Sequence, residues 1–260
     1  MEKVIAIANQ KGGVGKTTTA INLGASMAAA DLRVLLVDLD PQGNSTSGLG
    51  VDKNALEQSV YHLLADEGPA EMAVQSTDLD NLDLLPANRD LTGATVELLA
   101  ADGREYRLSR ALQNFRNSYD IVLIDCPPSL GILTLNALVA ADSLLIPMQC
   151  EFFAMEGLSE LLGTLERVRQ NYNPRLQIEG VLLTMYDDRL NLSSQIRDNV
   201  QHHLGAQVLR TMIPRNVRLA EAPSFGQPIL LYDARSKGAN CYLQLAREVL
   251  GNMGATGAQA

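Results

Sequence analysis

The chain has 260 residues, of which 46% are hydrophobic and 20% charged, and its formal net charge is −9 at pH 7. This composition excludes a disordered or fibrous chain, and we expect one domain over residues 1–250 followed by a flexible tail over residues 251–260. The three widely spaced Cys exclude a disulfide framework and a zinc site, and no apolar run is long enough to predict a membrane span.

Short apolar runs rich in β-branched residues alternate along the chain with longer helical patterns. The predicted strands are 4–8, 34–37, 82–85, 121–124, 144–146, 178–183 and 208–213. The predicted helices include 16–30, 105–117, 131–140, 154–170 and 192–204, with a short helix near 61–65. Strands of this kind are buried on both faces and need crossover helices, which predicts an α/β fold with a doubly wound, mostly parallel sheet and helices on both faces.

A glycine-rich turn joins the first predicted strand to the first predicted helix. It reads Lys11-Gly12-Gly13-Val14-Gly15-Lys16-Thr17-Thr18. Glycines let successive backbone N–H groups point inward at a polyphosphate, and the helix N-terminus adds the positive end of its dipole. The turn therefore predicts a nucleotide site over residues 11–18, in which Lys16 neutralises phosphate charge and the Thr17 hydroxyl binds Mg²⁺.

Aspartates end two of the predicted strands. Asp38 and Asp40 follow the second strand, and Asp125 follows the strand over 121–124. In doubly wound sheets, ligands bind at the carboxyl ends of the strands. Asp125 is thus a second candidate ligand of Mg²⁺, directly or through water. The alternatives are a simple turn at Asp-Pro-Gln-Gly and a helix cap at Asp125.

The phosphate loop departs from the general P-loop pattern at Gln10, where Gly is usual, and has a second lysine, Lys11, at its start. This deviant Walker A loop and the string VDLDPQGN resemble the ParA/Soj family of partitioning ATPases, P-loop proteins related to MinD. The similarity runs from Lys3 to about Leu250. It implies an ATPase with ATP and Mg²⁺ as cofactors. In this family, Lys11 would reach the phosphates of a partner copy and Asp40 would position the attacking water, with Asp38 in support.

The family resemblance also suggests how the base is held. Met185 and Pro214 would flank the adenine, Asn216 would read its edge, and Glu151 would contact nucleotide or a second copy. These positions follow predicted strands in the second half of the chain, so they can lie beside the nucleotide at the carboxyl ends of the strands. The alternative is that Met185 and Pro214 only fill the core.

A basic segment stands out in an acidic chain. Residues 184–240 contain seven Lys and Arg against five Asp and Glu, a net charge of +2, which leaves −11 for the rest. Arg189, Arg215 and Arg218 are the candidate DNA contacts, because long cationic side chains can hold phosphates without reading sequence. Resemblance to the family favours Arg189 and Arg218 over the alternative of scattered solvated arginines.

Three functional classes use related ATPases. A MinD-like membrane ATPase needs a basic amphipathic C-terminal helix, whereas residues 251–260 contain no charged side chain. A metallocluster carrier resembling the nitrogenase iron protein needs interface cysteines, and the residues around Cys126 and Cys150 fit the partition family better. We therefore expect a cytoplasmic, nucleoid-associated ATPase that dimerises with ATP, binds DNA nonspecifically and is released by hydrolysis, which a ParB-type partner stimulates. We expect no binding to membranes.

Overall fold

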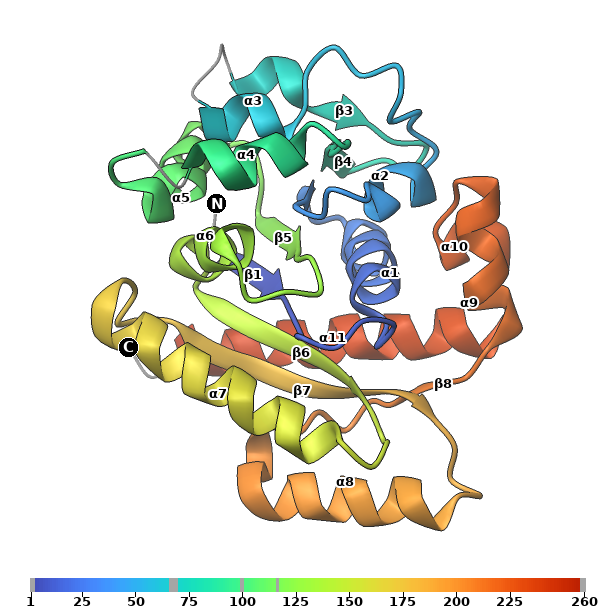
Figure 1. Ribbon diagram of the computed structural model, residues 1–260. Helices are drawn as coiled ribbons and strands as arrows, with labels where there is room; N and C mark the ends of the chain where they lie inside the picture. The colour runs from blue at the N-terminus through green and yellow to red at the C-terminus, as the bar shows by residue number, and fades with distance from the viewer. Residues whose placement is uncertain (1–2, 66–69, 99–100, 116, 258–260) are drawn as a thin grey trace.

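The computed structural model describes residues 3–65, 70–98, 101–115 and 117–257 and contains a twisted eight-stranded sheet (Figure 1). The strands are β1 (Lys3–Ile7), β2 (Val34–Asp38), β3 (Gln75–Ser76), β4 (Leu82–Leu85), β5 (Ile121–Asp125), β6 (Ser143–Gln149), β7 (Gln177–Tyr186) and β8 (Ile213–Pro214). They run in the order β3-β4-β2-β5-β1-β6-β7-β8, and every pair is parallel except β3 with β4. The predicted mostly parallel sheet is confirmed.

Helices cover both faces of this sheet, as Figure 1 shows. The α-helices are α1 (Lys16–Ala28), α2 (Asn44–Gly48), α3 (Val60–Ala65), α4 (Leu91–Glu97), α5 (Arg107–Ala111), α6 (Ile132–Ala140), α7 (Ala154–Asn171), α8 (Asn191–Leu204), α9 (Val217–Glu221), α10 (Ile229–Tyr232) and α11 (Lys237–Gly257). Short 3-10 helices include η5 (Gly205–Gln207) and η6 (Ala222–Phe225).

Two hydrophobic cores form because side chains alternate between the faces of each strand. In β1, Val4 and Ala6 enter one core while Ile5 and Ile7 enter the other. Helices α6 and α7 pack on the first core, and α1 and α11 pack on the second. This explains why the strands read as continuous apolar runs.

Strand β1 lies at the point where the chain changes direction across the sheet. It pairs with β5 on one side and with β6 on the other, although both come much later in the sequence. Such switch points leave a crevice at the carboxyl ends of the strands, where ligands bind in this architecture. The loops that follow β1, β2, β5, β6, β7 and β8 all leave the sheet at this edge.

Two predicted elements are shorter than expected. The strand predicted over 208–213 is reduced to β8 and an isolated bridge at Val208. Between them, the backbone N–H groups of Arg210 and Thr211 donate to the Glu248 carboxylate instead of to β7. The helix over 105–117 is broken into 3-10 turns around α5. The Leu108 N–H, in the first turn of α5, donates to the side chain of Asn136 in α6, which helps to fix where α5 begins.

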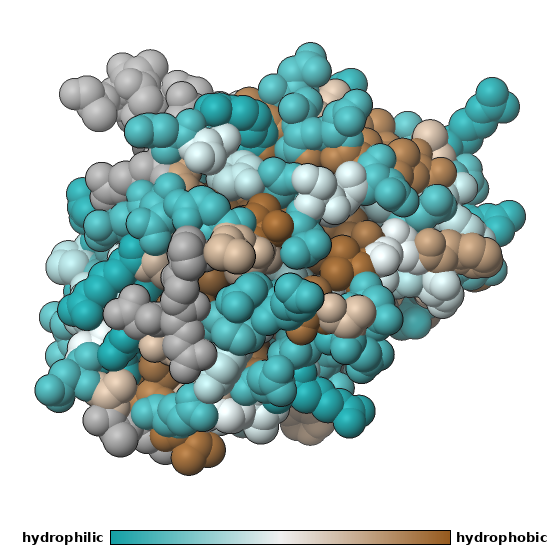
Figure 2. All heavy atoms as spheres, turned by 90° about the horizontal axis from the view of Figure 1, so that it is seen from above, coloured by the Kyte–Doolittle hydropathy of each residue, from teal (hydrophilic) through white to brown (hydrophobic). Residues whose placement is uncertain are grey.

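The C-terminal helix α11 is absent from the predicted helices and continues to Gly257, into the stretch expected to be a tail. Within the described residues, no helix is long and apolar enough to cross a membrane. The face shown in Figure 2 is mainly hydrophilic, with hydrophobic side chains gathered in small groups.

Candidate functional site

The glycine-rich turn after β1 opens into a cleft at the carboxyl edge of the sheet. Gly13 (φ 74°) and Gly15 (φ 86°) adopt left-handed conformations, which glycine adopts at little cost. A Cβ on Gly13 would meet nothing within 4 Å, so its backbone faces open space. The cleft is lined by Gly12, Gly13, Gly15, Lys16, Thr17, Thr18, Asp40, Gln42, Asn44, Pro128 and Met185. The segments that follow β1, β2 and β5 and the last residues of β7 thus meet around one hollow.

Neighbouring strands hold the turn in shape. Thr184 Oγ1 in β7 donates to the carbonyl oxygen of Val14 over 2.8 Å, and Gln149 Nε2 in β6 donates to that of Gly13 over 3.1 Å. Both residues were missed from the sequence, although they stand at the carboxyl ends of their strands. These two bonds fix the backbone of the turn against β6 and β7.

Lys16 lies at the floor of the cleft. It is 7% exposed, and its Nζ donates to the carbonyl oxygen of Lys11 over 3.1 Å. Burial lowers its pKa, an effect that Asp125, Cys126 and Asp40 partly offset. A buried cation with one neutral acceptor is suited to an anionic ligand.

Asp38 and Asp125 are adjacent across the β2–β5 pairing and are both fully buried. Burial raises the pKa of Asp125 to about 7, assisted by the charge of Asp38, and hydrogen bonds from the Ser45 and Thr17 hydroxyls oppose the rise. Ser45 Oγ donates to Asp125 Oδ2 over 2.7 Å, whereas Asp125 Oδ1 has no hydrogen-bond partner in the described part of the chain.

That orphaned oxygen fits a divalent cation. A buried carboxylate oxygen without a partner is costly, and Mg²⁺ prefers oxygen ligands such as a carboxylate and a hydroxyl. Asp125 and Thr17 supply both groups close together, since the Thr17 hydroxyl lies near enough to Asp125 to lower the pKa of this carboxyl. The candidate metal ligands are therefore together, and Ser45, which the sequence motifs did not reveal, is their neighbour.

Asp38 holds the segment that follows β2. Its Oδ2 accepts hydrogen bonds from the Thr46 N–H and Oγ1, both over 2.8 Å, and its Oδ1 accepts from the Asp40 N–H over 3.1 Å. These bonds lower the pKa of Asp38, but burial outweighs them and raises it to about 6. Asp40 itself lines the cleft, with its Oδ1 accepting from the Gln42 N–H over 2.9 Å.

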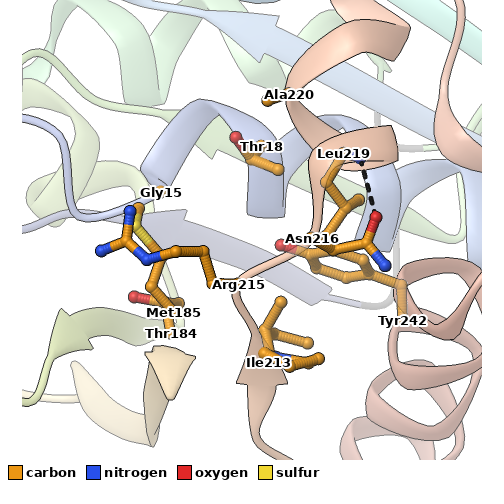
Figure 3. A pocket seen from close by; sticks show the side chains of 11 residues that line it. Gly15, Thr18, Thr184, Met185, Ile213, Arg215, Asn216, Leu219, Ala220 and Tyr242 are labelled. Carbon is orange, nitrogen blue, oxygen red and sulfur yellow. Dashed lines mark hydrogen bonds between the residues drawn. The ribbon is translucent and has the colours of Figure 1, made fainter. Parts of the chain in front are cut away.

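A second pocket adjoins the phosphate cleft and is shown in Figure 3. It contains the three residues predicted to hold a base, Met185, Pro214 and Asn216. The Asn216 carboxamide oxygen accepts from the Leu219 N–H over 3.3 Å and caps α9, which fixes the orientation of the amide. The remaining lining residues are Gly15, Thr18, Thr184, Ile213, Arg215, Leu219, Ala220 and Tyr242. A planar apolar group attached to a phosphate chain fits these two adjoining spaces.

Met185 lies where the two pockets meet, since it lines both, as Gly15 and Thr18 also do. Its backbone is left-handed (φ 49°), which is strained for a residue with a long side chain, and the β7–β8 register shifts at this point. Strain of this kind persists where neighbours enforce it, and here Gln149 Nε2 donates to the Met185 sulfur.

Lys11 behaves differently from Lys16. Its side chain is 44% exposed, forms an ion pair with Glu151 and is not among the residues that line the cleft. Val14 is also outside the lining, because it is buried. Lys11 thus lies at the rim of the phosphate cleft, with its side chain outside the site of its own copy.

The three candidate DNA contacts do not form one cluster. Arg189 is 84% exposed and makes a bidentate ion pair with Asp187, which lowers the pKa of Asp187 to about 2. Arg218 pairs with Glu221 over 3.0 Å and with Asp233 over 3.6 Å. Arg215 borders the base pocket and lies in Figure 3 on the side of Gly15 and Met185. Each arginine is exposed on the same edge as the cleft.

Comparison with known proteins gives consistent matches. A family model described as an AAA domain matches residues 2–178. The sporulation initiation inhibitor protein Soj of Bacillus subtilis is 56% identical over 252 residues, 97% of this chain and all of that protein. The chromosome partitioning protein ParA of Caulobacter vibrioides is 54% identical, covering 95% of this chain and 94% of its own. The crystal structure of a Mycobacterium smegmatis protein described as cobyrinic acid a,c-diamide synthase, with bound ADP and magnesium, is 43% identical with a TM-score of 0.85 over 96% of this chain and 94% of that one.

Proposed function

Because the chain belongs to the ParA/Soj family of chromosome-partitioning ATPases, we propose that its ATP-bound form is a homodimer that holds DNA without reading its sequence. Hydrolysis of ATP, stimulated by a ParB-type partner, then returns monomers and releases the DNA. The chain acts as one ATPase domain in the cytoplasm, on the nucleoid. The observation that carries this proposal is that Lys11 stands at the rim of a phosphate cleft that it does not line.

In its own copy, each chain binds the nucleotide through the turn after β1. The N–H groups of residues 12–18 and the Lys16 ammonium hold the phosphates, and burial of Lys16 strengthens the attraction by lowering the local dielectric. Thr17 and Asp125 hold Mg²⁺, whose chemistry is to neutralise phosphate charge. Met185, Pro214 and Asn216 enclose the adenine, with the capped Asn216 amide presenting its N–H₂ group to the edge of the base.

Asp40 accepts a hydrogen bond from the water that attacks the terminal phosphate. It is a carboxylate at the lip of the cleft, on the segment that Asp38 ties to Thr46. The Thr46 hydroxyl also accepts from the Ala87 N–H over 2.9 Å, which anchors this segment to the end of β4. Rigid anchoring keeps Asp40 within reach of the phosphate, as positioned catalysis requires.

The most direct test is retention of DNA by the purified chain with ATP, ADP or no nucleotide, across a salt series. We expect retention only with ATP and Mg²⁺, with binding that weakens steeply as salt rises because phosphate contacts release counterions. Equal retention in all three nucleotide states would refute the proposed switch.

Arg218→Ala should weaken DNA binding to a similar degree for every DNA sequence. The slope of log affinity against log salt should become less steep by about 2 per dimer, since each copy loses one phosphate contact. The exposed ion pairs of Arg218 are weak enough for a DNA phosphate to displace them. Arg175→Ala is the matched control, because Arg175 is exposed just before the start of β7, at the opposite edge of the sheet. Equal losses in the two variants would argue against a specific DNA face.

A further inference from the structure

Three of the four phenylalanines in this chain are exposed to solvent. Phe115 is buried, whereas Phe152, Phe153 and Phe225 are 79%, 66% and 64% exposed. Phe152 and Phe153 are consecutive and pack edge to face, with ring centroids 5.1 Å apart and an interplanar angle of 90°. Two adjacent exposed aromatic rings are a costly arrangement for a monomer in water, and aromatic residues of this kind are enriched at interfaces.

The backbone holds this pair outward. Residues 150–153 form a tight turn between β6 and α7, in which the Glu151 N–H donates to the carbonyl oxygen of Gln149 and the Ala154 N–H donates to that of Glu151. The carbonyl oxygen of Phe153 accepts from the Gly157 N–H in the first turn of α7. With both ends of the turn bonded in this way, the rings remain at the surface.

The turn adjoins the rim of the phosphate cleft. Glu151, directly before the Phe pair, is the ion-pair partner of Lys11, and both side chains are about half exposed. A second copy close enough for Lys11 to reach its phosphate would also cover the turn that touches Lys11. The neighbouring side chains of opposite charge suit a two-fold axis, because an isologous interface must be complementary to itself.

We propose that Phe152 and Phe153 are the apolar anchor of the interface between two copies of this chain. This inference rests on the proposed ATP-dependent dimer and names the surface that closes it. The rings exclude water beside the contact between Lys11 and the partner's phosphate, so the charge attraction there acts in a drier environment.

Local charge favours a second copy over a membrane. From Glu151 to Glu166 the chain contains four glutamates and no lysine or arginine. Segments that insert aromatic rings into anionic bilayers rely on an excess of nearby positive charge. Here Glu151 pairs with the one cation described at the turn, Lys11, and the other three glutamates leave the surroundings acidic.

The test is a double variant, Phe152→Ser with Phe153→Ser, studied with a non-hydrolysable ATP analogue and Mg²⁺. Both rings are exposed, so the thermal unfolding temperature without nucleotide should be unchanged. Affinity for the analogue at protein concentrations too low for dimerisation should also be unchanged, whereas the dimer dissociation constant from sedimentation should rise at least about 100-fold, as for loss of central interface aromatics. Phe225→Ser is the matched control, and it should shift this constant by less than about threefold.

The outcomes separate the two ideas. If the wild type dimerises and the double variant dimerises as tightly, the Phe pair is not the anchor and only this inference fails. If the wild type stays monomeric with the analogue, the proposed function fails and this inference fails with it. Flotation with vesicles of phosphatidylethanolamine and phosphatidylglycerol tests whether the Phe pair binds a membrane instead of a second copy. Flotation that is lost in the double variant, with dimerisation intact, would make the pair a membrane anchor and overturn the inference.

Discussion

Lys11→Ala should bind ATP with nearly normal affinity and yet remain a monomer. The backbone of Lys11 is held without its side chain, because its N–H donates to Asn9 Oδ1 and its carbonyl oxygen accepts from Lys16 Nζ. The cleft should therefore keep its shape in the variant. What is lost is a cation at the rim that can reach a second copy, and hydrolysis should fall about a thousandfold or more, as when an arginine finger is removed.

Light scattering with ATP and Mg²⁺, together with nucleotide titration, measures the two properties of Lys11→Ala separately. Glu151→Gln is the control for the ion pair, since it removes the charge that holds Lys11 in its own chain but keeps the lysine. If Lys11 acts only through Glu151, the two variants should behave alike. A Lys11→Ala protein that forms a normal ATP-dependent dimer would contradict the role across the interface.

The parts of the site that could be predicted are those that depend on neighbouring residues in the sequence. The turn over residues 11–18 follows β1 and opens α1, and Asp38 and Asp125 each end a strand. Strand, turn and helix in that order fix where the N–H groups and carboxylates lie. For the same reason the doubly wound sheet could be inferred from alternating apolar runs.

The parts that could not be predicted depend on contacts between distant segments. Tyr242 lines the base pocket from α11, and its hydroxyl lies 3.2 Å from Thr19 Oγ1 in α1, a contact that no local pattern indicates. The ion pair of Lys11 with Glu151 joins residues 140 positions apart. The shortening of the strand at 208–213 depends on Glu248 in the same way. Ser45 and Thr46 were missed because α2 is too short for its hydroxyl residues to give a periodic signal.

Asp40→Ala should bind ATP, dimerise and remain on DNA, because the step that ends this state is blocked. Asp40 lines the cleft, and the methyl group of alanine cannot orient a water molecule or accept its proton. Losing a positioned carboxylate of this kind slows hydrolysis by about 10²- to 10⁴-fold. Phosphate release should fall by that factor, while retention on DNA with ATP should last longer than for the wild type.

Two further variants separate chemistry from folding at this site. Asp40→Asn keeps an oxygen that can accept the Gln42 N–H but loses the charge, so it should also hydrolyse ATP slowly.

Asp38→Ala instead leaves the Thr46 N–H, the Thr46 hydroxyl and the Asp40 N–H without their buried acceptor, and the free energy of unfolding should fall by about 3 kcal/mol or more. For Asp40→Ala the same fall should be only about 1 kcal/mol, since one hydrogen bond is lost. Wild-type turnover in Asp40→Ala would rule out its role in positioning water, and a loss of stability as large as that of Asp38→Ala would make Asp40 a structural residue.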